Sequence, residues 1–164
     1  MTFHIDVQNK SAYSLNTEKL QLAVTYVLNQ HDAHPDSSLS IVFVDNDYVQ
    51  NLNRQFRGID APTDVLSFPA DTPPVEIEDE PPYLGDLIIA YPYASAQAAR
   101  ENHQLDDSLS LLVIHGTLHL LGYDHDTPEN RAEMWSAQAE VLTALAISPD
   151  IVPALEESSN DSSH

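Results

Sequence analysis

The chain has 164 residues, with 26 acidic residues against 6 lysines and arginines, a formal net charge of −20, and no cysteine. That length suits one domain with a sizeable core, and the lack of thiols excludes disulfides and thiolate metal sites. The acidic balance argues against non-specific binding to nucleic acid, because the phosphates would repel the protein. No signal-peptide pattern or bilayer-length apolar run is present, so we expect a cytoplasmic protein with neither membrane nor DNA as a partner.

The predicted elements follow from hydrophobic periodicity, with alternation or short β-branched runs for strands and apolar stripes at helical spacing for helices. In chain order they are a strand at 3–9, a helix at 16–30, a strand at 39–45 and a helix at 46–58. Two strands follow at 63–68 and 85–92, and then three helices at 93–102, 106–122 and 127–145. Asn16 and Thr127 are the expected N-caps of two helices. Prolines on both sides of the third strand favour an edge position, because proline cannot donate a ladder hydrogen bond.

Strands and helices mix without strict alternation, which predicts an α/β (α+β) fold with a small mixed β-sheet packed with helices. We expect one domain at residues 1–149. The acidic, proline-rich segment at 71–82 is expected to be a loop, and the acidic tail at 150–164 is expected to be disordered.

Three histidines cluster in the segment HGTLHLLGYDH, which starts at His115. His115 and His119 are four residues apart, so on a helix both imidazoles lie on one face. Gly122 can adopt the left-handed conformation that ends a helix, and the turn can bring His125 to the same point. Burying such polar groups unpaired would cost about 1–3 kcal/mol each. The spacing therefore predicts a three-histidine metal site at the end of a central helix, with an open fourth position as in catalytic zinc sites.

Two alternatives stay open. The spacing also matches the metzincin metallopeptidase motif H-E-x-x-H-x-x-G-x-x-H, but the general-base glutamate of those enzymes is replaced here by Gly116. Met134 falls in a helical pattern, which favours a core residue over the methionine turn of that class. The other alternative is a non-catalytic module in which the metal only staples the helix to the next turn. That site would require a fourth protein ligand, such as His103.

The histidine segment, together with FRGIDAPTDVLSFP (56–69) and LGDLIIA (84–90), resembles the YbeY family of bacterial and organellar endoribonucleases. The resemblance covers about residues 39–145. It implies a single α/β domain that holds one divalent metal ion, expected to be zinc, on His115, His119 and His125.

The same resemblance implies a function and partners. We expect a metal-dependent, single-strand-specific endoribonuclease that acts in ribosomal RNA maturation, at the 3′ end of the small-subunit RNA, and in ribosome quality control. The implied partners are ribosomal RNA and the small ribosomal subunit or assembly factors such as a ribosome-associated GTPase. Because a protein of net charge −20 should bind free RNA weakly, we expect a partner to present the RNA.

The resemblance also implies a functional arginine before PTDVLSFP, which is Arg57 in this sequence. Arg57 and the metal ligand His115 are the residues expected to be catalytic. Phosphodiester cleavage needs positive charge on the non-bridging oxygens, and the planar guanidinium of arginine can grip phosphate bidentately. Arg54 can project beside Arg57 or be an ordinary solvated helix residue.

The general base stays open at this point. Asp124 lies beside a ligand histidine, where a role in the turn is at least as good an interpretation. Asp86 can orient a ligand histidine or cap its strand, and Asp64 lies in the other family-like block. An RNA substrate carries its own nucleophile in the 2′-hydroxyl, so both hydrolysis and 2′-hydroxyl attack remain compatible with the sequence.

Overall fold

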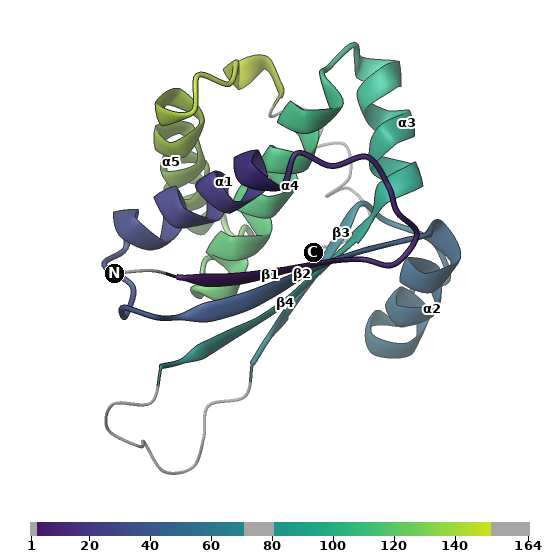
Figure 1. Cartoon of the computed structure of the whole chain (residues 1–164), viewed down its shortest axis with the longest axis horizontal. Helices are drawn as coiled ribbons and strands as arrows, with labels where there is room; N and C mark the ends of the chain where they lie inside the picture. Colours follow the sequence, from purple (N-terminus) through teal and green to yellow (C-terminus); the bar gives the residue numbers. More distant parts are fainter. Residues whose placement is uncertain (1–2, 71–80, 152–164) are drawn as a thin grey trace.

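The computed structural model describes residues 3–70 and 81–151 of the chain. The elements in chain order are β1 (His4–Asn9), α1 (Thr17–Gln30), β2 (Ser38–Val44), α2 (Asn46–Arg57), β3 (Val65–Pro69), β4 (Tyr83–Ala90), α3 (Tyr91–Glu101), α4 (Leu105–Leu120), α5 (Pro128–Ala144) and a 3-10 turn (Pro149–Ile151). Figure 1 shows the helices gathered around one twisted sheet. The predicted α/β class is confirmed.

The sheet has four strands in the order β1-β2-β4-β3. β1, β2 and β4 run parallel to one another, and β3 pairs antiparallel with β4. The mixed sheet is therefore as predicted, and β3 occupies the edge position that its flanking prolines favoured.

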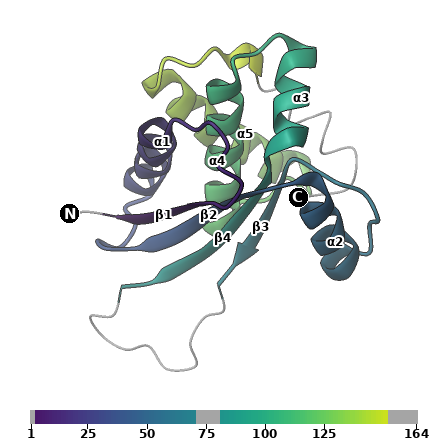
Figure 2. The same ribbon diagram turned by 45° about the vertical axis from the view of Figure 1, so that its right-hand side comes forward.

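The two faces of the sheet carry separate apolar clusters, because successive strand residues point to opposite sides. Leu87 and Ile89 of β4 join the large core formed with α1, α4 and α5. Ile88, between them, packs with Leu66 of β3 and with Val49 of α2. Two views of the ribbon agree, with α1, α4 and α5 over one face and α2 on the other side of the strands (Figure 1 and Figure 2).

Two boundaries differ from the sequence prediction. Helix α3 begins at Tyr91 and takes Pro92 into its first turn, where the missing N–H of proline has no helical partner to lose. The predicted start of the disordered tail, at residue 150, is too early. Residues 149–151 form a 3-10 turn, and Ile151 is buried in the core. The rest of that tail, and residues 71–80 of the predicted acidic loop, lie outside the described residues.

Helix α4 is the central helix, as predicted, and eleven of its sixteen residues are buried. Gly116 lets it lie close to the sheet, because a Cβ at this position would be 2.7 Å from Cδ2 of the buried Leu87. It would also lie 3.3 Å from Oγ of Ser67 in the edge strand. Across the described ranges, no helix combines the length and the apolar composition needed to cross a bilayer.

We expect the substitution Gly116→Glu to lower the free energy of unfolding by about 3–5 kcal/mol, because it overpacks the contact with Leu87 and buries a carboxylate. Urea unfolding measures this. The matched control is Thr143→Glu at an exposed position of α5, which should change stability by less than about 0.5 kcal/mol. Equal stability of the two variants would show that α4 and β4 are not packed this tightly.

Candidate metal centre

The end of α4 is built as a glycine-terminated helix that turns the chain back. Gly122 has a φ of +104°, a region that favours glycine. Its N–H donates to the carbonyl of His119, and the N–H of Tyr123 donates to the carbonyl of Leu118, both at 3.0 Å. This is the Schellman pattern of helix ends. The predicted role of Gly122 is confirmed, and the turn carries His125 toward the helix that it has just left.

The turn brings His115, His119 and His125 together, as the spacing predicted. One ring nitrogen of each lies within 4.8 Å of those of the other two. The Nε2 atoms of His115 and His119 are 3.1 Å apart. Two nitrogens bound to one tetrahedral zinc at about 2.0–2.1 Å would be separated by about 3.3 Å. The α4 pair is thus already spaced as ligands of one ion.

Gln138 of α5 fixes the tautomer of His115. His115 is 1% exposed, and its Nδ1 lies 2.7 Å from Oε1 of the fully buried Gln138. An amide oxygen only accepts hydrogen bonds, so Nδ1 of the imidazole carries the proton and donates it. The lone pair of the neutral ring is then on Nε2, which faces His119. The donor set therefore fits a metal ion, because the ligand nitrogen is the one that converges on the cluster.

Gln138 was not among the residues predicted from the sequence, although the sequence contains a signal for it. Gln138 lies four residues after Met134 and three before Val141, on the stripe of α5 that packs into the core. A polar side chain on such a stripe needs a buried partner. Met134 itself is fully buried within the helix, which confirms its prediction as a core residue and not part of a methionine turn.

Trp135 forms a wall of the cluster. Its ring centroid lies 5.8 Å from that of His115 and 5.6 Å from that of His125, both edge to face. These contacts hold two of the three imidazoles against α5. They also leave the indole, which is half-buried, beside the proposed metal position.

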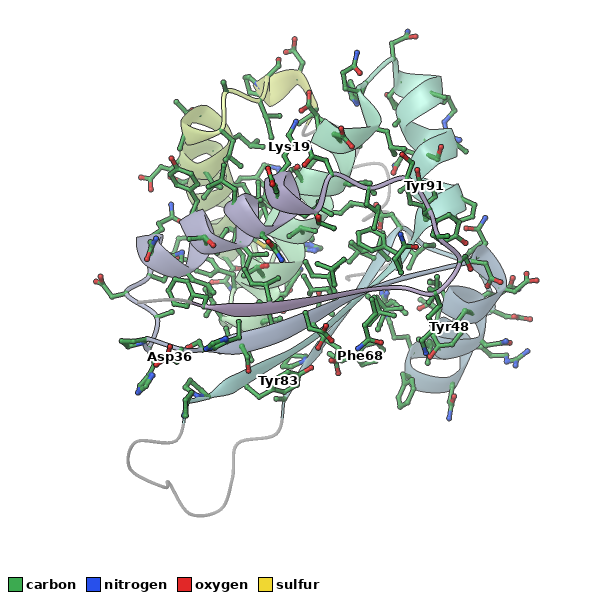
Figure 3. All side chains as sticks on the ribbon, viewed as in Figure 1. Lys19, Asp36, Tyr48, Phe68, Tyr83 and Tyr91 are labelled. Atoms are coloured by element: carbon green, nitrogen blue, oxygen red, sulfur yellow. The ribbon has the colours of Figure 1, made fainter. Side chains whose placement is uncertain are left out.

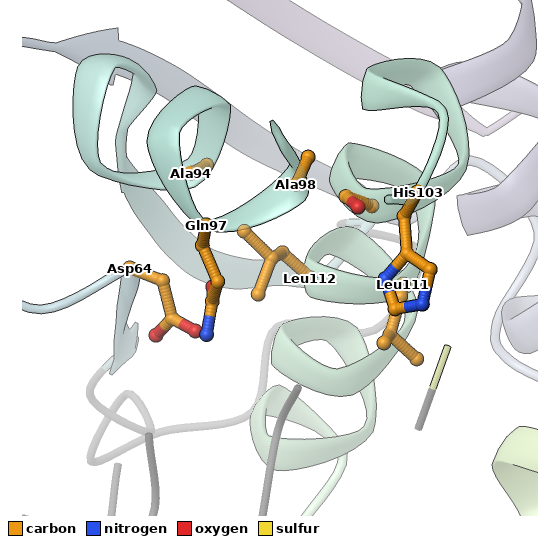
Figure 4. Close-up of a pocket in the computed structure, with 8 residues that line it drawn as sticks. Asp64, Ala94, Gln97, Ala98, His103, Leu111 and Leu112 are labelled. Atoms are coloured by element: carbon orange, nitrogen blue, oxygen red, sulfur yellow. The ribbon is translucent and has the colours of Figure 1, made fainter. Parts of the chain in front are cut away.

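Gly116 faces the sheet, away from the cluster, since a Cβ there would contact Leu87 and Ser67. A side chain at this position would not point at the three histidines. His103, considered as a fourth ligand, lines a small cavity of about 10 Å³ between α3 and α4 with Gln97 (Figure 4). That cavity holds about one water molecule. In the described ranges, the group of side chains that could hold a metal ion consists of the three predicted histidines.

The three candidate bases have other partners. Asp64 is fully buried, accepts a hydrogen bond at 2.8 Å from the N–H of Val65, and lines the same small cavity (Figure 4). Asp124 accepts a hydrogen bond at 2.8 Å from the N–H of His125, which is a turn contact. Asp86 accepts a hydrogen bond from the hydroxyl of Tyr83, so its carboxylate has a partner on the strand itself.

Tyr83 and Asp86 belong to the face of the sheet that α4 does not cover. Figure 3 shows Tyr83 below the strands, away from α4. Partial burial raises the pKa of Tyr83, and the hydrogen bond to Asp86 raises it further. Asp86 and Leu87 are neighbours in β4, so their side chains point to opposite faces of the sheet, and Leu87 faces α4. The alternative that Asp86 orients a ligand histidine is therefore wrong for this structure.

Arg57 is the last residue of α2 and is half-buried. The structure places α2 against the face of the sheet opposite α4. The ring of the adjacent Phe56 contacts Phe68 of β3, with centroids 5.4 Å apart. Ser67, next to Phe68, faces α4. The end of α2 and the histidine helix thus lie on the two sides of one edge strand.

Replacing Gln138 by leucine removes the acceptor for Nδ1 of His115. We expect zinc to bind about 10–100-fold more weakly, whereas Gln138→Glu keeps an acceptor and the wild-type affinity. Competition with a chelator measures affinity, and ¹⁵N chemical shifts report the His115 tautomer. Trp135 is the single tryptophan of the chain, so its fluorescence follows binding at this site. Equal loss of affinity in both variants would contradict the assigned tautomer.

Comparisons with known proteins agree with this geometry. The family model described as Endoribonuclease YbeY matches residues 4–146. Endoribonuclease YbeY of Streptomyces griseus is 40% identical over 144 residues, 84% of this chain and 87% of that protein. Its counterpart from Corynebacterium diphtheriae is 41% identical over 145 residues, 84% of this chain and 74% of that protein. A solution structure from Thermotoga maritima aligns with a TM-score of 0.55 and 25% identity, covering 95% of this chain and 93% of that one. This chain belongs to the YbeY endoribonuclease family.

Proposed function

We propose that this protein is a metal-dependent endoribonuclease that cuts single-stranded RNA. The observation that carries the proposal is the converging cluster of His115, His119 and His125, with the tautomer of His115 fixed by Gln138. Membership of the YbeY family supplies RNA as the substrate. We further propose zinc as the metal, since three imidazoles with an open fourth position suit catalytic zinc.

The roles of the chain's own residues follow from their positions. The three histidines would hold the metal, and a bound divalent ion supplies Lewis acidity toward water and phosphoryl oxygens. Gln138 keeps Nδ1 of His115 protonated, so the ligand lone pair points into the cluster. Trp135 shields two imidazoles on one side. Asp124 holds the backbone N–H of His125 and so positions the turn.

Arg57 is proposed to bind the RNA backbone from the other side of β3. The end of α2 contacts this edge strand through Phe56 and Phe68. On the opposite face, Ser67 of the same strand lies against α4 at Gly116, the residue that follows His115. An extended RNA strand that crosses the edge of β3 would meet both groups. The arginine would neutralise non-bridging oxygens while the metal site acts at the scissile phosphate.

The acidic charge favours a substrate that is presented by a partner. At physiological salt, charges further away than about 8 Å are largely screened, so distant acidic segments need not oppose a local site. Free RNA would still be bound weakly by a protein of net charge −20. We propose that the substrate is ribosomal RNA, near the 3′ end of the small-subunit RNA. The small subunit or an assembly factor such as a ribosome-associated GTPase would present it in the cytoplasm, in maturation and quality control.

Removing a ligand should abolish metal binding and cleavage together. We expect one zinc ion per chain by elemental analysis and none in His119→Ala. Cleavage of a small-subunit RNA fragment by that variant should fall to the level of the chelator-treated wild type. The control is His34→Ala, an exposed histidine between α1 and β2, which should keep both properties. Loss of the metal with unchanged cleavage would overturn the proposed function.

Replacing Arg57 by glutamine should leave the zinc content unchanged and lower kcat/KM for RNA cleavage by about 100-fold, since it removes positive charge from the transition state. The matched control is Arg100→Gln in the last turn of α3, which we expect to retain wild-type activity. Circular dichroism checks that both variants fold. Cleavage at the wild-type rate by Arg57→Gln would show that this arginine has no part in catalysis. The proposed mechanism would then rest on the metal site alone.

A further inference from the structure

A second arginine lies beside the histidine cluster. The guanidinium carbon of Arg131, in the first turns of α5, is 4.6 Å from the centroid of the Trp135 ring. The same ring packs against His115 and His125. One indole therefore contacts both the guanidinium and two of the proposed metal ligands. Arg131 is half-buried, so its side chain is held in place and not spread into solvent.

The charge of Arg131 stands out in its surroundings. The turn before α5 carries Asp124 and Asp126 on either side of His125, and Glu129 and Glu133 flank the arginine on the helix. Asp124 and Asp126 are engaged locally, with the N–H of His125 and with Nδ2 of Asn130, each at 2.8 Å.

An acidic turn of this kind would repel the phosphates of an approaching RNA strand. A bound metal ion offsets this repulsion at the cluster itself. Arg131 offsets the repulsion on the far side of the Trp135 ring. This position suits a neighbouring phosphate better than the phosphate that is cut. Stacking on the indole places the planar guanidinium, which can bind phosphate bidentately, beside the cluster.

We propose that Arg131 binds a backbone phosphate of the RNA strand adjacent to the scissile position and that Trp135 is the platform that orients it. This inference rests on the proposed function, because it places the phosphate of an RNA substrate beside the metal centre. Arg131 acts as a substrate-binding residue, separate from Arg57 on the far side of β3. The two arginines would contact the strand on opposite sides of the cleavage site.

The test compares Arg131→Gln with Arg100→Gln, which removes the same charge from α3. Glutamine keeps a planar group that can stack on Trp135 but carries no charge, so loss of charge is separated from loss of packing. The probe is a short single-stranded RNA with 2′-O-methyl groups, bound to the zinc-loaded full chain over a range of salt. Binding is followed by probe anisotropy and by the fluorescence of Trp135, the single tryptophan.

We expect Arg131→Gln to weaken binding about tenfold and to reduce the slope of log K against log salt by about 0.7, the value for one phosphate contact on a single strand. The RNA affinity of Arg131→Lys should lie between those of Arg131→Gln and the wild type, because lysine keeps the charge but does not stack as a planar group. Zinc content and melting temperature should stay at their wild-type values in all three variants.

The outcomes separate this inference from the proposed function. Equal effects of Arg131→Gln and Arg100→Gln, or an unchanged salt slope, would overturn the role of Arg131 while leaving the nuclease intact. A lower zinc content in Arg131→Gln would show that the arginine supports the cluster and does not bind substrate, which also overturns the inference. A wild-type protein that neither binds nor cleaves single-stranded RNA would overturn the proposed function and this inference with it.

Discussion

The metal centre depends on the hydrogen bond between His115 and Gln138. It joins two helices that are consecutive in the chain, α4 and α5, at a point where both side chains are buried. Without this acceptor the proton of the neutral imidazole could occupy either nitrogen, and the lone pair would not be directed at His119. The buried amide thus directs the lone pair of one helical histidine toward the other, which is the arrangement that two ligands of one metal ion need.

The close packing of α4 on the sheet determines where the cluster lies. Gly116 allows the helix to approach β4 at Leu87, so the face with His115 and His119 is turned toward α5. A side chain at this position would point into the sheet and away from the three histidines, so it could not act as the general base of a metzincin. In this fold the residue between the histidines serves packing, whereas in the metzincin motif it serves proton transfer.

An acidic nuclease requires that positive charge be placed where the substrate passes. Arg57 lies at the end of α2, on the far side of the sheet from α4, and Arg131 lies on the indole of Trp135 in α5. The edge strand β3 lies between α2 and α4. Most of the negative charge is then no obstacle to binding, because screening limits its reach to about 8 Å at physiological salt.

The sequence by itself determined the elements, the mixed sheet class, the edge position of β3 and the cluster of three histidines. These follow from local rules: periodicity of two or 3.6 residues, the i, i+4 spacing of His115 and His119, and the turn that Gly122 permits. The tertiary structure alone decided that Gln138 and Trp135 meet the histidines and that Asp86 does not. Such contacts depend on how one helix face packs against another, and this is set by side chains far apart in the sequence. The same reason explains Ile151, whose burial in the core no local pattern of the acidic tail predicted.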